Sequence, residues 1–134
     1  MEVLVDTSIW SLALRRNKQK AVANTFVSQF SELINETRVR IIGPIRQELL
    51  SGITEELQFQ KLKKHLEAFE DLPIISKNYE RAAEMHNQCR RKGISGGHVD
   101  FLICSVAEYH HLAIFTNDKD FVYYAKHLPI TLYS

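Results

Sequence analysis

Short β-branched runs alternate with amphipathic helical patterns along the whole chain, and this alternation is the strongest constraint on its fold. Strands are predicted at residues 2–5, 38–42, 72–75, 113–116 and 129–133. Helices are predicted at residues 7–13, 20–36, 44–52, 54–69, 78–92, 98–111 and 119–127. Such alternation favours a mainly parallel sheet with helices on both faces. We therefore expect the α/β class and a single domain over residues 1–134.

Cap and breaker residues set the boundaries of these segments. Gly43-Pro44 ends the second strand and opens a helix, because proline suits the first helical turn. Thr54, followed by two glutamates, is predicted to cap the next helix. Gly96-Gly97 marks a loop that we expect to be flexible. The large aromatic side chains of the first helices are expected in the core, with an exposed, partner-binding Trp10 as the alternative.

Charge and hydropathy exclude several classes of protein. The 134 residues carry a net charge of +1, which by itself gives no reason to expect a nucleic-acid partner. The longest stretch without a charged residue, 21–31, is shorter than the roughly 18 residues that cross a bilayer. The first six residues lack the basic and apolar regions of a signal peptide, so we expect a cytoplasmic protein. Cys89 and Cys104 lack metal or redox spacing, which favours two reduced structural thiols.

Four acidic residues are placed so that their side chains are expected to meet. Asp6 and Asp118 each follow a predicted strand, and ligands bind at the carboxyl ends of parallel strands. Glu48 lies in the first turns of the helix after the second strand. Asp100 lies in the first turn of a helix and borders its apolar stripe, so we expect it to be half-buried.

Grouped carboxylates need compensation. Two of them about 4 Å apart repel by roughly 4 kcal/mol at an effective dielectric constant near 20. Oxygen ligands without histidine or cysteine at ligand spacing favour Mg²⁺ or Mn²⁺ over zinc. Such ions activate water and stabilise the transition state of phosphodiester hydrolysis. The four acids therefore predict a metal-dependent phosphodiesterase site.

Ordinary structural roles are the alternative for each acid taken alone. Asp6 and Asp118 precede helices and have the chemistry of N-cap residues. Asp120 either supports the site or only occupies the first turn of its helix. The histidines lack companions at ligand spacing and are not expected to bind metal: His98, His110 and His111. The 95–97 loop is not a phosphate loop, because no lysine follows its glycines.

Four blocks of sequence resemble the acidic blocks of PIN-domain ribonucleases. They are Val-Asp6-Thr-Ser-Ile-Trp, the isolated Glu48, Val-Asp100-Phe-Leu-Ile-Cys-Ser-Val-Ala, and Ile-Phe-Thr-Asn-Asp118-Lys-Asp120-Phe. The resemblance covers essentially the whole chain. In length and in the lack of an appended domain, the chain is most similar to the VapC-type toxins of bacterial toxin–antitoxin pairs.

This resemblance implies a three-layer α/β/α sandwich of the PIN type and a Mg²⁺- or Mn²⁺-dependent endoribonuclease that uses a metal-activated water. It also implies a small cognate antitoxin that covers the active-site groove. The implied catalytic and metal-binding residues are Asp6, Glu48, Asp100 and Asp118. The implied hydrogen-bonding partners that orient them are Thr7, Thr116, Asn117 and Asp120, although the resemblance does not decide whether Asp118 or Asp120 faces a second metal.

Two other function classes stay open from the sequence. A catalytically silent module that binds RNA or protein would use the same fold. A phosphoryl-transfer domain fits less well, because Lys119 directly follows Asp118 at a helix start and not at the end of a later strand. The chain is small enough for exposed apolar helix faces to make a homodimer plausible.

A basic cluster near the first acid is the preferred RNA contact, with an ordinary solvated helix face as the alternative. Its residues are Arg15, Arg16, Lys18 and Lys20. Removing the four negative charges of Asp6, Glu48, Asp100 and Asp118 from the total leaves +5 for the rest of the chain. The near-neutral total is therefore compatible with a nucleic-acid substrate.

Overall fold

A computed structural model describes residues 1–14 and 21–134 of the chain. Its strands are β1 (Val3–Val5), β2 (Val39–Arg40), β3 (Ala113–Phe115) and β4 (Thr131–Leu132). Its helices are α1 (Thr7–Leu14), α2 (Ala21–Asn35), α3 (Gly43–Leu50), α4 (Glu56–Leu66), α5 (Ser76–Arg91), α6 (His98–His110) and α7 (Asp120–Ala125). No helix in these two ranges is both long and apolar enough to cross a membrane.

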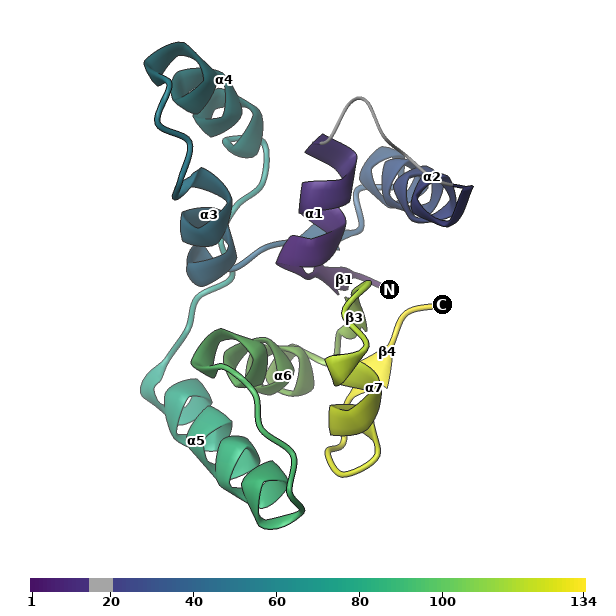
Figure 1. Ribbon diagram of the computed structural model, residues 1–134, viewed down its shortest axis with the longest axis vertical. Coiled ribbons are helices and arrows are strands. Elements are labelled where there is room, and N and C mark those ends of the chain that lie inside the picture. The colour runs from purple at the N-terminus through teal and green to yellow at the C-terminus, as the bar shows by residue number, and fades with distance from the viewer. Residues whose placement is uncertain (15–20) are drawn as a thin grey trace.

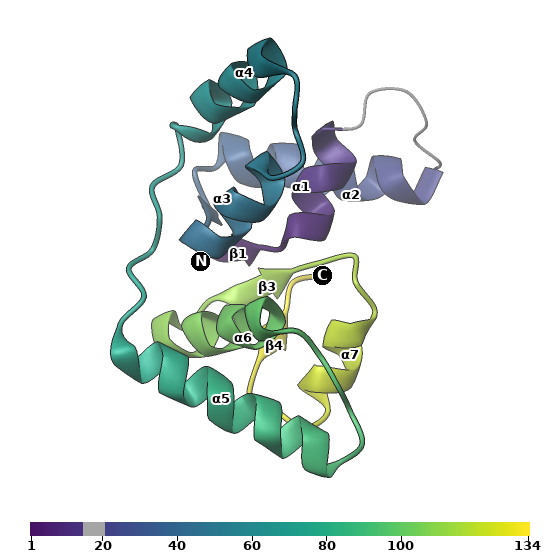
Figure 2. The ribbon, with the colours of Figure 1, turned by 60° about the vertical axis from the view of Figure 1, so that its left-hand side comes forward.

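The sheet has the order β2-β1-β3-β4, and every pairing in it is parallel. Helices α1 to α4 lie on one side of the sheet, and α5 to α7 lie on the other (Figures 1 and 2). Parallel strands need crossover connections, which the intervening helices provide. The predicted three-layer α/β/α architecture is confirmed.

The two central strands are buried on both faces, as parallel strands covered by helices require. Every residue of β1 and β3 is buried. On the α1 side, Trp10 is only 5% exposed, and its indole N–H donates to the Val5 carbonyl at 3.2 Å. Phe30 and Phe69 pack edge-to-face against Trp10, with ring centroids 4.8 and 5.0 Å away. Trp10 is therefore a core residue.

The strand predicted at residues 72–75 is wrong. Only a single parallel bridge forms there, between Ile41 and Asp71, with the Leu72 N–H donating to the Ile41 carbonyl at 2.9 Å. Pro73 has no N–H with which to extend a strand ladder. Arg46 of α3 holds this segment instead, through an ion pair with Asp71 at 3.0 Å and hydrogen bonds to backbone carbonyls at the end of α4.

Two smaller sequence expectations have different outcomes. Thr54 is not the cap of α4, because the helix begins one residue later and the Glu55 side chain accepts from the Gln58 N–H at 2.6 Å. The expectation of two structural thiols is confirmed, since Cys89 and Cys104 are both free and buried. Burial raises the pKa of both thiols, which disfavours the reactive thiolate.

Candidate metal centre

The carboxyl ends of β1 and β3 bring Asp6 next to the segment that carries Asp118. Val5 pairs with Phe115, and the Asp6 N–H donates to the Phe115 carbonyl at 2.8 Å. Asp6 follows β1 directly, and Asp118 lies three residues beyond β3. The predicted shared rim at this edge of the sheet is present.

Asp6 is buried and is held by two hydroxyl groups. Its Oδ2 accepts from Ser8 Oγ and from Thr116 Oγ1, both at 2.8 Å. The same two hydroxyls accept the backbone N–H groups of Asn117 and Asp118, each at 2.9 Å. A hydroxyl has one hydrogen, so accepting these N–H groups leaves that hydrogen for Asp6. Among the described residues, the Asp6 carboxylate thus binds two hydroxyls, while its backbone carbonyl accepts the N–H groups of Ile9 and Trp10 at the start of α1.

The turn from β3 into α7 fixes the next two acids. Asp118 Oδ1 accepts the Asp120 N–H at 2.9 Å, which starts α7 and leaves the other Asp118 oxygen outside this bond. The cap-like role proposed as an alternative for Asp118 is therefore present, alongside its position in the acidic group. Asp118 is half-buried, while Asp120 is exposed.

Asp100 completes a close group of three carboxylates. One carboxylate oxygen from each of Asp100, Asp118 and Asp120 lies within 4.8 Å of the others. Within the described parts of the chain, no histidine or cysteine joins this group. Asp120 is thus placed with the candidate ligands, which the sequence left open.

Burial and neighbouring charge act on Asp100. The pKa of its carboxyl is raised from 3.8 to about 6, mainly by desolvation and also by the charges of Asp6, Asp118 and Asp120, while the Tyr124 hydrogen bond acts in the opposite direction. The Tyr124 hydroxyl donates to Asp100 Oδ2 at 2.8 Å. The pKa of Tyr124 is raised well above its usual range, mainly by burial and then by this hydrogen bond.

Glu48, like Asp6, is not one of the three closely grouped carboxylates, so the structure does not bring all four predicted acids into one close group. Glu48 is exposed on α3, and its Oε1 accepts from Thr7 Oγ1 at 2.9 Å. Glu48 lines a depression of about 380 Å³ together with Val99, the residue directly before Asp100. Thr7 therefore orients Glu48, whereas Thr116 and Ser8 orient Asp6.

No basic side chain compensates these acids within residues 1–14 and 21–134. The ion pairs there involve other acids, namely Glu2, Glu36, Asp71, Glu84 and Glu108. A half-buried group of oxygen ligands without a paired cation has the chemistry that a hard divalent ion requires. The residues at this edge therefore fit Mg²⁺ or Mn²⁺.

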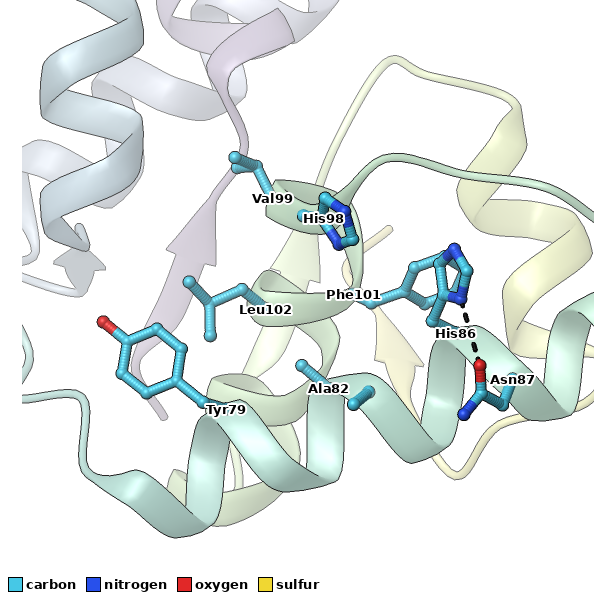
Figure 3. Close-up of a pocket in the computed structure, with 9 residues that line it drawn as sticks. Tyr79, Ala82, His86, Asn87, His98, Val99, Phe101 and Leu102 are labelled. Carbon is cyan, nitrogen blue, oxygen red and sulfur yellow. Dashed lines mark hydrogen bonds between the residues drawn. The ribbon is translucent and has the colours of Figure 1, made fainter.

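A groove with a volume of about 440 Å³ lies between α5 and α6, and none of the three grouped carboxylates lines it (Figure 3). Tyr79 lies at one end and Asn87 at the other, while Val99 and Phe101, which flank Asp100 in sequence, lie along it. His98 stacks on His86 in its wall, with ring centroids 5.7 Å apart. Neither histidine contributes a ligand atom to the candidate metal site formed by Asp100, Asp118 and Asp120.

Sequence reasoning missed two residues that bind the acids. Neither Ser8 nor Tyr124 is among the site residues that the resemblance implies. The position of Ser8, two residues after Asp6, is its local signal, because a hydroxyl supplies a hydrogen that a nearby carboxylate can accept. Tyr124 carries no local signal. The predicted RNA contacts Arg15, Arg16, Lys18 and Lys20 lie outside the described residues.

Comparison with known proteins identifies the family. The PIN domain family model matches residues 3–127. A search of curated proteins gave no match.

Solved structures from three organisms have the same fold. FitAcB from Neisseria gonorrhoeae matches with a TM-score of 0.78 and 20% identity, over 98% of this chain and 96% of that chain. VapBC2 from Rickettsia felis, bound to a DNA fragment from its promoter, matches with a TM-score of 0.77 and 22% identity, over 99% of this chain and 98% of that chain. DNA-bound VapBC from Salmonella typhimurium matches with a TM-score of 0.69 and 18% identity, over 99% of this chain and 97% of that chain. With its family match over nearly its whole length and its acids at the carboxyl edge of a parallel sheet, the chain belongs to the PIN domain family.

Proposed function

We propose that this protein is a Mg²⁺- or Mn²⁺-dependent endoribonuclease that acts as the toxin of a toxin–antitoxin pair, within a single domain of residues 1–134. The observation that carries the proposal is a group of carboxylates, on a PIN fold, with which no basic side chain of the described residues pairs. PIN domains are generally nucleases. The requirement for a divalent metal and the choice of RNA are the parts that need testing.

The proposed site consists of acidic metal ligands and of other residues that hold these ligands in place. Asp6, Asp100 and Asp118 would hold the ion, with Glu48 at the edge and Asp120 able to contribute. When bound, a divalent ion lowers the pKa of a coordinated water and neutralises charge on the phosphate that is attacked. Ser8, Thr116 and the Asn117 backbone keep Asp6 in place, while Thr7 keeps Glu48 in place.

Cleavage assays with and without metal test this proposal. Purified protein incubated with structured and unstructured RNA should cleave in Mg²⁺ or Mn²⁺, stop on addition of EDTA, and recover when metal is restored. The products should carry a 5′-phosphate and a 3′-hydroxyl, because in the proposed reaction water attacks phosphorus and the 3′-oxygen is the leaving group. Undiminished cleavage in EDTA contradicts the metal dependence, and 2′,3′-cyclic phosphate ends contradict attack by water.

The basic cluster before α2 supplies a second test. We propose that Arg15, Arg16, Lys18 and Lys20 contact RNA phosphates, since they follow α1, which starts beside Asp6. Phosphate contacts release counterions, so reversing the charges of Arg15 and Arg16 should weaken binding and reduce the slope of log K against log salt. Fluorescence anisotropy of a labelled RNA in EDTA measures both the affinity and its dependence on salt. An unchanged salt slope would show that Arg15 and Arg16 do not contact RNA phosphates.

We also propose a protein partner. The similar structures include VapBC and FitAB assemblies, and one is described as a toxin–antitoxin complex from Klebsiella pneumoniae. A small antitoxin that covers the acidic edge would keep RNA away from it. A homodimer and a cytoplasmic location complete the proposal, and light scattering of the purified protein measures the oligomeric state.

A further inference from the structure

Tyr124 lies behind Asp100 as a completely buried side chain of α7. Its ring packs against Phe101 and Phe121, with centroids 4.8 and 5.1 Å away. Its hydroxyl donates to Asp100 Oδ2 at 2.8 Å. A ring held on two sides leaves the hydroxyl little freedom, so it points at one position.

Gly96 provides the space that this hydroxyl occupies. A Cβ atom at Gly96 would overlap with the Tyr124 hydroxyl, lie 2.8 Å from Tyr124 Cζ and lie 2.9 Å from Phe101 Cε2. These distances are shorter than real Cβ contacts allow. The loop from α5 to α6 passes beside α7 (Figure 2). Gly96 therefore meets a packing requirement, while the flexibility expected for this loop stays a prediction.

Each buried or half-buried acid of the centre is held by a donor. Asp6 binds two hydroxyls, and Asp118 binds the Asp120 N–H. Tyr124 plays this part for Asp100, which lies on a different element. Donors behind metal ligands fix their orientation, and losing one typically weakens metal binding by about 10- to 100-fold.

We propose that Tyr124 is a positioning residue that holds the Asp100 carboxylate in the orientation for binding a divalent metal, and that Gly96 is required because it leaves room for the Tyr124 hydroxyl. This inference rests on the proposed metal-dependent function. It adds α7 and the α5–α6 loop to the parts of the chain that shape the centre.

Manganese binding without RNA tests the proposal directly. The dissociation constant of Mn²⁺ for the metal-free protein is measured by electron paramagnetic resonance of the free ion. Tyr124→Phe removes one oxygen and keeps the packed ring, so we expect binding to weaken about 10- to 100-fold. Gly96→Ala should weaken it in the same range by displacing the hydroxyl. The double variant should be no weaker than the weaker of the two single variants, because both act on one hydrogen bond.

The chain offers a matched control for each variant. Tyr123→Phe removes a hydroxyl from the exposed neighbour on α7, whose ring lies 5.2 Å from the Lys126 ammonium. Gly97→Ala adds a methyl group where no atom lies within 4 Å. Both controls should keep the wild-type Mn²⁺ affinity within about twofold. Thermal unfolding of every variant verifies that the binding assay is made on folded protein.

The outcomes separate this inference from the proposed function. Wild-type affinity in folded Tyr124→Phe overturns the positioning role, and so does a wild-type protein that binds no Mn²⁺. If Tyr124→Phe does not fold, Gly96→Ala decides the question. Wild-type Mn²⁺ affinity in folded Gly96→Ala then overturns the positioning role of Tyr124, and weakened affinity supports it. Weakened Mn²⁺ binding in these variants, in a protein that cleaves no RNA, supports the positioning role and contradicts only the ribonuclease proposal.

Discussion

Asp6→Asn is expected to reduce RNA cleavage by about a thousandfold or more while the protein stays folded. The asparagine side chain retains an oxygen that accepts from Ser8 and Thr116, so the hydrogen bonds that join the ends of β1 and β3 persist. What disappears is a negative charge in a buried position. Loss of about 4 kcal/mol of transition-state stabilisation corresponds to a factor near 10³ in rate.

Single-turnover cleavage in saturating Mg²⁺ measures this effect apart from substrate binding. Asp71→Asn is the matched control, because it removes the same charge from an exposed residue that pairs with Arg46 and is not part of the acidic group. Its activity should equal that of the wild type. Asp6→Asn activity within tenfold of wild type would place Asp6 outside the chemistry.

The position of Asp6 was predictable because it depends on local rules. A residue directly after a buried parallel strand lies at the carboxyl edge of the sheet, and the same rule placed Asp118. These placements need only the order of strands and helices. The pairing of Val5 with Phe115 is a finding of the structure, because the order of elements along the chain does not determine which strands are neighbours or their register.

Other features depend on packing between distant elements. Tyr124 reaches Asp100 because α7 packs against the start of α6 and because Gly96 leaves the space, and no periodicity encodes that contact. The residues near Pro73 have the composition of a strand. However, the single bridge to Ile41 and the missing proline N–H prevent a longer ladder there.

The second large effect concerns stability, and it has the opposite sign to the loss of activity. Asp100→Asn is expected to stabilise the metal-free protein at pH 8. Folding raises the pKa of Asp100 from 3.8 to about 6, mainly by desolvation, so the folded state binds this proton more tightly than the unfolded state does. The wild-type protein therefore loses stability as pH rises from about 4 to about 6, and the loss persists above pH 6.

A shift of this size corresponds to about 3 kcal/mol, which we reduce to about 2 kcal/mol because the carboxylate is only partly shielded from solvent. Urea unfolding in EDTA at pH 4 and pH 8 measures the difference between variant and wild type. We expect Asp100→Asn to be more stable by about 2 kcal/mol at pH 8 and to lose most of that advantage at pH 4. Asp71→Asn should give no such gain at either pH.

Divalent metal should make the wild type more stable than Asp100→Asn, because an ion bound between the acids stabilises only the folded state. Adding Mg²⁺ at pH 8 should raise the unfolding midpoint of the wild type and leave that of Asp100→Asn nearly unchanged. A variant that is less stable than wild type at pH 8 in EDTA would show that Asp100 is compensated by a charge or hydrogen bond beyond Tyr124. Stabilisation of the wild type alone by Mg²⁺ would explain the destabilising carboxylate at residue 100 by metal binding, since the carboxylate lowers the stability of the metal-free protein and a bound ion would offset the loss.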